Sequence, residues 1–324
     1  MNYEDFKEEL QEELQANFLQ HIDFSTAVVK KVNETLEGLT LRFENQNKIA
    51  PTIYPERLYE EYKNGTSVEE IVDNISESLF ITGDYPELPS LTAENAEKCI
   101  SFSLINKEKN KELIAECPHK EVYDMVAVPR WYISDEASFI VDNNIMQMLH
   151  MTKEEILEVA QRNTELGNYT CKNINEVMKE IMVSDGIEEE FINEVLPMGQ
   201  VPFYVLSNEK GIDGSCAVLS DSFMQRVSDK LGNDGIFLLP SSRHEMIAVG
   251  FDNAIHLEDL KEIVGAVNND PLLMQKQDYL SGSIYQYNAK THTLSICDSM
   301  GMFHNKECQK ESMKQSIGRG RIGI

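Results

Sequence analysis

The spacing of apolar residues along the chain predicts a mixture of helices and short strands. Near the N-terminus, Phe6, Leu10, Leu14 and Phe18 recur every four positions, with acidic residues between them. Side chains three or four positions apart lie on the same face of a helix. We therefore expect an amphipathic N-terminal helix that packs on its own domain or on a partner.

Shorter apolar runs predict strands that are joined as hairpins. Residues 25–44 fit two strands around a turn within Asn33–Gly38, because β-branched residues alternate with polar ones on both sides of a glycine. Residues 235–240 and 245–251 each have the length of a buried strand, and the polar loop Ser241–Glu245 between them has a common hairpin size. Residues 281–299 predict a further hairpin.

Capping signals place several helices between these strands. Thr152 and Glu155 have the spacing of a capping box, and Ser220 or Asp221 precedes a helical pattern that ends at Gly232. Residues 136–149 and 214–219 fit additional strands. Hairpins that adjoin helices predict an α+β fold with largely antiparallel sheets.

The length of 324 residues is enough for two subdomains. A Cys-Pro-His sequence at 117–119 marks the best candidate boundary. We expect an N-terminal α+β domain over residues 1–117 and a C-terminal α+β domain over residues 118–304. Residues 305–324 contain several glycines and lack amphipathic spacing, so we expect a flexible tail.

The charge balance limits the classes of ligand. The chain has 55 acidic and 29 basic residues, a formal net charge of −26 that repels nucleic-acid phosphates and anionic membranes. We expect neither as a direct ligand. The six cysteines show no zinc-like spacing and fit reduced thiols. No apolar run approaches the about 18 residues of a membrane span, and the acidic N-terminus does not resemble a signal peptide, so the cytoplasm is the expected location.

Four segments carry a resemblance to a known family: VNETLEGLTL, IAPTIYPERLYEEYKNGTSVEEIV, LPSSRHEMIAV and LSGSIYQYN. From about residue 20 to residue 300, the chain resembles an uncharacterised bacterial family, chiefly from gut-dwelling Firmicutes, whose members are domain-of-unknown-function proteins. The resemblance implies an intracellular bacterial protein and supplies no catalytic residues. VNETLEG departs from the Asn-Asn-Gly type of turn expected there.

One loop gathers most of the chemically capable side chains, namely Ser241, Ser242, Arg243, His244 and Glu245. A serine nucleophile needs a base within about 3 Å, and His244 is near enough in sequence to approach Ser242. Glu245 points to the opposite face if the strand has already begun, and no Gly-x-Ser-x-Gly elbow surrounds Ser242. The pattern therefore favours a hairpin tip over a binding loop, and a binding loop over a catalytic site.

Cys216 and Trp131 are the remaining candidate site residues. Cys216 follows two glycines, so a thiol nucleophile with His244 as its base is the alternative to a core position. Trp131 stands at the end of a predicted strand, where it fits either an interface anchor or the half-buried edge of the core.

Metal and acid–base sites are not favoured. The His244-Glu245 pair lacks the second histidine of a His-Glu-x-x-His zinc site, because residue 248 is alanine, and Cys117 and His119 are too close for the usual zinc spacing. The acidic residues Asp135, Glu136 and Asp142 do not stand out in so acidic a chain. We expect no metal and no cofactor.

The lack of catalytic spacing favours a non-enzymatic cytoplasmic protein that binds a protein or small-molecule partner. One alternative is a hydrolase that uses Ser242 or Cys216 with His244. The other is an acidic antagonist of a DNA-binding protein.

Overall fold

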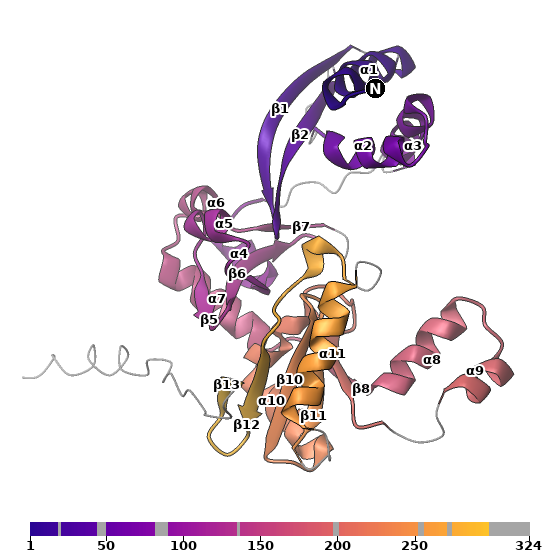
Figure 1. The fold of residues 1–324 in the computed structure, drawn as a ribbon. Coiled ribbons are helices and arrows are strands. Elements are labelled where there is room, and N and C mark those ends of the chain that lie inside the picture. Colours follow the sequence, from indigo (N-terminus) through magenta and orange to yellow (C-terminus); the bar gives the residue numbers. More distant parts are fainter. Residues whose placement is uncertain are drawn as a thin grey trace, which may run out of the picture. The chain divides into compact units, whose positions relative to one another are not determined.

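The computed structural model describes residues 1–18, 21–43, 50–81, 90–134, 137–196, 201–251, 256–270 and 274–297. The chain divides into two compact units (Figure 1). The first contains Met1–Asn163 with Gln275–Tyr279, and the second contains Thr164–Met274 with Leu280–Ile324. Both combine helices with antiparallel sheets, which confirms the α+β prediction.

The first unit begins with helix α1 (Tyr3–Asn17), whose apolar stripe is buried as predicted. Phe6, Leu10 and Leu14 are fully buried in a core shared with helices α2 and α3 and with a small antiparallel sheet. The helices are α2 (Pro55–Lys63) and α3 (Val68–Ile81), and the sheet has the order β1 (Ile22–Lys31), β2 (Glu34–Phe43) and β3 (Thr52–Ile53). Figure 1 shows α1, α2 and α3 beside the long β1–β2 hairpin.

The turn of this hairpin is tighter than predicted. Lys31 pairs with Glu34, so the turn consists of Val32 and Asn33 rather than the Asn33–Gly38 segment. Asn33 has a φ of 64°, a left-handed conformation that asparagine tolerates better than most residues. Gly38 lies inside β2, where a side chain would crowd the neighbouring strands.

A four-stranded sheet and short helices complete the first unit. The strands are β4 (Ile100–Asn106), β5 (Lys120–Val122), β6 (Met125–Tyr132) and β7 (Ser138–Ile140). The helices are α4 (Ala93–Cys99), α5 (Lys111–Ala115), α6 (Asn143–Met148), α7 (Lys153–Glu165), which continues into the second unit, and the 3-10 turn η2 (Lys276–Asp278).

Strand β6 pairs with β4 and with β5, so residue 117, the boundary expected from the sequence, lies inside one sheet-forming unit. The expected tail at 305–324 lies outside the described residues.

The strand predicted over residues 136–149 is wrong for most of its length. Only β7 is extended, and Asp142 then begins α6 by accepting a hydrogen bond from the amide of Ile145 at 2.8 Å. An aspartate that caps a helix in this way satisfies an otherwise unpaired amide. The capping box before α7 is confirmed, because the Thr152 hydroxyl accepts from the Glu155 amide while the Glu155 carboxylate accepts from the Thr152 amide.

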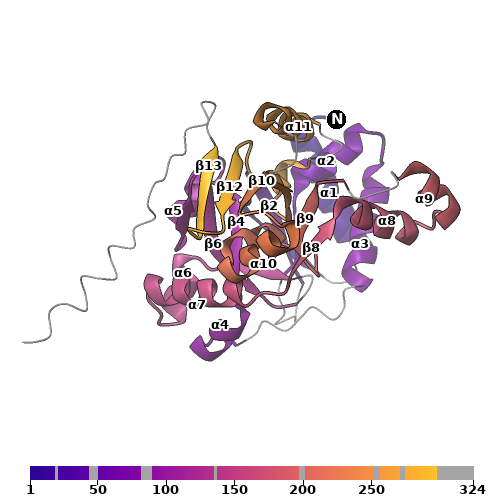
Figure 2. The same ribbon diagram turned by 90° about the horizontal axis from the view of Figure 1, so that it is seen from below.

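The second unit is built on a six-stranded antiparallel sheet with the order β13–β12–β10–β11–β9–β8. Its strands are β8 (Tyr169–Asn173), β9 (Tyr204–Asn208), β10 (Gly235–Ser242), β11 (Glu245–Gly250), β12 (Ile284–Asn288) and β13 (Thr293–Cys297). Both hairpins predicted for this region, β10–β11 and β12–β13, are confirmed. Figure 2 shows the helices α10 and α11 of this unit beside the strands.

The helices of the second unit are α8 (Ile174–Ser184), α9 (Glu189–Val195), α10 (Asp221–Leu231) and α11 (Leu257–Asn269). Ser220 caps α10 and Gly232 ends it, as predicted. The segment predicted as a strand, Gly214–Leu219, is instead the 3-10 helix η1, which follows the left-handed residue Asp213. Within the described part of the chain, no helix is long and apolar enough to cross a membrane.

Candidate functional site

The predicted polar loop is a tight turn at the end of the β10–β11 hairpin. Ser242 pairs with Glu245, so the turn itself contains only Arg243 and His244. The register shifts between Pro240 and Ser242, which marks a bulge just before the turn. The Ser241 hydroxyl donates to the Glu245 carboxylate at 2.8 Å, across the base of the turn.

This turn is docked against the segment that joins β9 to η1. The Arg243 guanidinium pairs with the buried Asp213 carboxylate at 3.0 Å, and the Arg243 carbonyl accepts from the Ser215 hydroxyl at 2.6 Å. The His244 carbonyl accepts from the Ser207 hydroxyl at 2.8 Å. The turn therefore has a structural role, because it supplies acceptors and a cation to the neighbouring segment.

The hydroxyl and the imidazole proposed as a catalytic pair each accept a backbone hydrogen bond, the first within the turn and the second from the neighbouring segment. Ser242 Oγ accepts from the His244 backbone amide at 3.0 Å, and His244 Nδ1 accepts from the Asp213 amide at 3.1 Å. An Nδ1 that accepts a hydrogen bond places the proton of a neutral imidazole on Nε2. These contacts favour the hairpin-tip interpretation of the loop.

Cys216 occupies a core position in η1. Its side chain is buried, and its sulfur lies 3.6 Å from the hydroxyl of Tyr169. Burial raises the pKa of the Cys216 thiol to about 12, so the thiolate that a nucleophile needs is scarcely formed at neutral pH.

Trp131 lies in β6 of the first unit and is fully buried. Its ring stacks on Phe139 with the ring centroids 5.8 Å apart, and its Nε1 has no hydrogen-bond acceptor within the described ranges. An interface anchor must reach the surface. In this conformation Trp131 instead supports the core.

The remaining sequence candidates do not assemble a metal site. His119 Nδ1 lies 3.0 Å from the Cys117 carbonyl oxygen, and the Cys117 side chain is buried. Among the residues that the structure describes, no group of three or more His, Cys, Asp or Glu side chains is placed to hold a metal ion. Asp142 is the cap of α6, and Asp135 and Glu136 lie outside the described residues.

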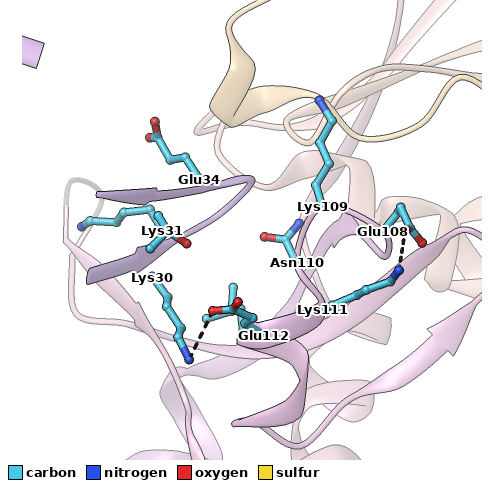
Figure 3. Close-up of a pocket in the computed structure, with 10 residues that line it drawn as sticks. Lys30, Lys31, Glu34, Glu108, Lys109, Asn110, Lys111 and Glu112 are labelled. Carbon is cyan, nitrogen blue, oxygen red and sulfur yellow. Dashed lines mark hydrogen bonds and ion pairs between the residues drawn. The ribbon is translucent and has the colours of Figure 1, made fainter. Parts of the chain in front are cut away.

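A cavity of about 220 Å³ lies in the first unit, between the tip of the β1–β2 hairpin and residues 108–113 (Figure 3). Lys30 pairs with Glu116 at 2.6 Å, and Lys111 pairs with Glu108. Lys109 lies over the ring of Tyr279. Figure 3 shows the lysine side chains pointing in different directions, so they do not converge on a common point as an anion site requires.

The sequence pattern did not reveal a polar cluster at the start of α10. The two carboxylate oxygens of Asp221 each lie 2.6 Å from a partner, one from the Tyr287 hydroxyl and the other from His292 Nδ1. Gln225 donates to the Tyr287 hydroxyl at 2.8 Å. The cluster ties the β12–β13 turn to α10, and its Asp221 and His292 side chains are half exposed. No local signal marks it, because Asp221 and His292 lie 71 positions apart.

The clearest exposed feature of the second unit is the helix pair α8–α9, which leaves the sheet at its edge strand β8 (Figures 1 and 2). Half of the twelve large apolar side chains that are exposed within the described ranges lie between residues 178 and 195. We call these six side chains the α8–α9 surface: Met178, Ile181, Val183, Ile187, Phe191 and Val195.

The apolar face of each helix is only partly covered. Met178 and Ile181 are three positions apart on α8, and Phe191 and Val195 are four positions apart on α9, so each pair shares a helix face. Ile192 is fully buried and fixes α9 in place, whereas Phe191 and Val195 are 54% and 50% exposed. Apolar groups gathered on the surface in this way are typical of an interaction site.

Comparison with known proteins gives a family and no function. A family model described as a family of unknown function matches residues 3–289. No curated protein and no solved structure matches the chain.

Proposed function

Because this chain belongs to DUF5688, a family of unknown function, we propose its role from its own side chains: it is a binding protein that holds a protein partner on the α8–α9 surface. The single observation that carries this proposal is the concentration of exposed apolar side chains in one helix pair. Each of them is accessible to a partner without any rearrangement of the core.

The size of the expected contact agrees with a binding role. Full burial of a large apolar side chain contributes about 1.5–3 kcal/mol, so covering a half-exposed one contributes about 1 kcal/mol. Six such side chains contribute about 6 kcal/mol in total before the entropy cost of association is subtracted. Apolar contact alone would give weak binding, and polar groups around the surface must add to it.

The contacts of the candidate catalytic residues support binding over catalysis. Ser242 accepts a hydrogen bond within the β10–β11 turn, His244 accepts one from the neighbouring Asp213 amide, and the Cys216 thiol is buried with a raised pKa. The cysteines of the described residues are free thiols, which supports a location in the reducing cytoplasm.

Site-specific photo-crosslinking in the native host tests the proposal. A photoreactive amino acid placed at position 181 or position 191 should form the same discrete protein adduct from both sites. Ile263 of α11 is the matched control, since it is an exposed isoleucine of the same unit. Val195→Asp should abolish the adducts from the other two positions. Adducts that form equally from position 263, or none from 181 and 191, would refute the proposal.

Activity-based labelling tests the hydrolase alternative. A fluorophosphonate probe should leave Ser242 unmodified, and iodoacetamide should modify Cys216 far more slowly than the partly exposed Cys171 and Cys297. Selective and saturable modification of Ser242 or Cys216 in the folded protein would instead favour an enzyme.

A further inference from the structure

We infer that the segment bound by the α8–α9 surface is a basic amphipathic helix of a partner protein. This inference rests on the proposed function and names the class of partner. It follows from the charges that border the exposed apolar side chains.

The border of the surface is strongly acidic. Between residues 172 and 195 the chain has seven carboxylates and two lysines. Both lysines are already neutralised, since Lys172 pairs with Glu180 at 2.7 Å and Lys179 pairs with Glu189 at 2.7 Å. The remaining carboxylates are exposed and have no ion pair among the described residues: Glu176, Asp185, Glu188, Glu190 and Glu194.

The acidic border determines which classes of partner can bind the α8–α9 surface. A second copy of the chain would bring the same acidic border against itself, and each copy already has a formal net charge of −26. An anionic membrane surface would be repelled for the same reason. A partner with lysine or arginine beside its apolar residues gains favourable charge pairing, which also excludes acidic competitors.

The arrangement of the apolar residues favours a helix as the bound segment. The exposed side chains lie at helical spacings, Met178 with Ile181 on α8 and Phe191 with Val195 on α9. Apolar side chains at these spacings suit a bound amphipathic helix, because such a helix presents its own apolar residues three and four positions apart. Such a helix also places basic side chains on both sides of its apolar stripe.

Defined peptides and the full-length protein test this inference. The probe is a labelled amphipathic helix of leucine and lysine, and its binding is followed by fluorescence anisotropy. The first control peptide has the same composition in an order that forms no apolar face, and the second has glutamate in place of lysine. The leucine–lysine helix should bind best, with an affinity that falls as salt is raised.

Matched variants connect the binding to the α8–α9 surface. Phe191→Asp should weaken binding of the leucine–lysine helix at least about tenfold, equivalent to about 1.4 kcal/mol, and Val195→Asp provides a second, independent disruption. Ile263→Asp on α11 should have no effect. Glu190→Gln with Glu194→Gln should weaken binding less and reduce its salt dependence, whereas Glu262→Gln on α11 should leave both unchanged.

The outcomes separate this inference from the proposed function. Equal binding of the lysine and glutamate helices, or an equal loss in Phe191→Asp and Ile263→Asp, overturns the basic-partner inference. If no peptide binds while crosslinks from positions 181 and 191 persist, the inference fails and the proposed function stands. If both the peptide binding and the crosslinks are absent, both fail.

Discussion

Substitution of Gly214 by alanine tests the docking of the β10–β11 turn. An added Cβ would lie 2.3 Å from Ser207 Oγ, 2.5 Å from the His244 carbonyl oxygen and 2.8 Å from the Asn208 nitrogen. Two of these are backbone atoms, from β9 and from the β10–β11 turn, so neither can simply rotate away. The turn and η1 would have to separate to make room.

The magnitude follows from the contacts that must change. Overpacking a well-packed site costs about 1–3 kcal/mol. Displacing the His244 carbonyl also weakens the 2.8 Å hydrogen bond from Ser207, which contributes about 1 kcal/mol. We expect Gly214→Ala to favour local opening by about 3 kcal/mol, which corresponds to about a hundredfold change in the opening equilibrium.

Alkylation of Cys216 measures that opening, because this thiol lies in η1 two residues after Gly214 and is buried. In the natural protein Cys216 should react with iodoacetamide only through rare opening, and Gly214→Ala should accelerate the reaction about a hundredfold. Mass spectrometry resolves each cysteine, and the partly exposed Cys171 and Cys297 serve as internal references.

Gly265→Ala is the matched control for this measurement. Gly265 lies within α11, and an added Cβ there would meet no atom within 4 Å. Alanine is favoured over glycine in a helix by about 1 kcal/mol, so labelling of Cys216 should stay equal or slow down. A labelling rate of Cys216 in Gly214→Ala that matches the natural protein would refute the docking argument.

Three smaller perturbations test other parts of the fold. Asn33→Gly should lose the hydrogen bonds from Asn33 Nδ2 to three backbone carbonyls of the first unit. Asn33→Ala should destabilise the protein by about 1 kcal/mol more than Asn33→Gly, because alanine is strained at a φ of 64°. Urea denaturation followed by Trp131 fluorescence compares them, and equal midpoints would contradict the argument. Glu165→Ala should destabilise the second unit by about 1 kcal/mol, because the Glu165 carboxylate accepts hydrogen bonds from the first two amides of α10 at 2.9 Å. An unchanged melting curve by circular dichroism would contradict this prediction. Hydrogen bonds from the backbone and side chain of Thr152 lower the pKa of the Glu155 carboxyl from its ordinary value of 4.5. The stability that Glu155 contributes is therefore complete above pH 4.5 and is lost as the pH falls through the lowered pKa. The melting temperature of Glu155→Gln should consequently be below that of the natural protein at neutral pH and equal to it in strong acid.

Local signals in the sequence predicted the elements whose conformation is decided locally. The four-residue spacing of Phe6, Leu10 and Leu14 is sufficient to place α1, and the Thr152–Glu155 pair forms its capping box within a single turn. The β10–β11 hairpin follows from two apolar runs of strand length on either side of a short polar segment. In each case the residues that determine the conformation are close in sequence, so a local sequence pattern is enough to predict it.

One wrongly predicted strand and one unpredicted cluster have distant contacts as their cause. Gly214–Leu219 is apolar and short enough for a strand, but the left-handed Asp213 and the bonds from Ser215 to the Arg243 carbonyl fix a 3-10 helix. The cluster of Asp221 and His292 has the same origin, since its members lie 71 positions apart in the sequence. The spacing of apolar residues along the sequence gives no information about such contacts.

The acidic residues of the α8–α9 pair lie beside apolar residues that the helix leaves accessible. Glu188, Glu189 and Glu190 are exposed, as expected for carboxylates on the solvated side of a helix. The hydrophobic residues beside them fit the buried side, yet Phe191 remains 54% exposed while its neighbour Ile192 is fully buried. In the seven-residue helix α9, only the narrow stripe that contains Ile192 is buried. The apolar residues on either side of that stripe stay accessible next to the carboxylates, and this juxtaposition gives the α8–α9 surface both an attractive apolar area and a selective charge.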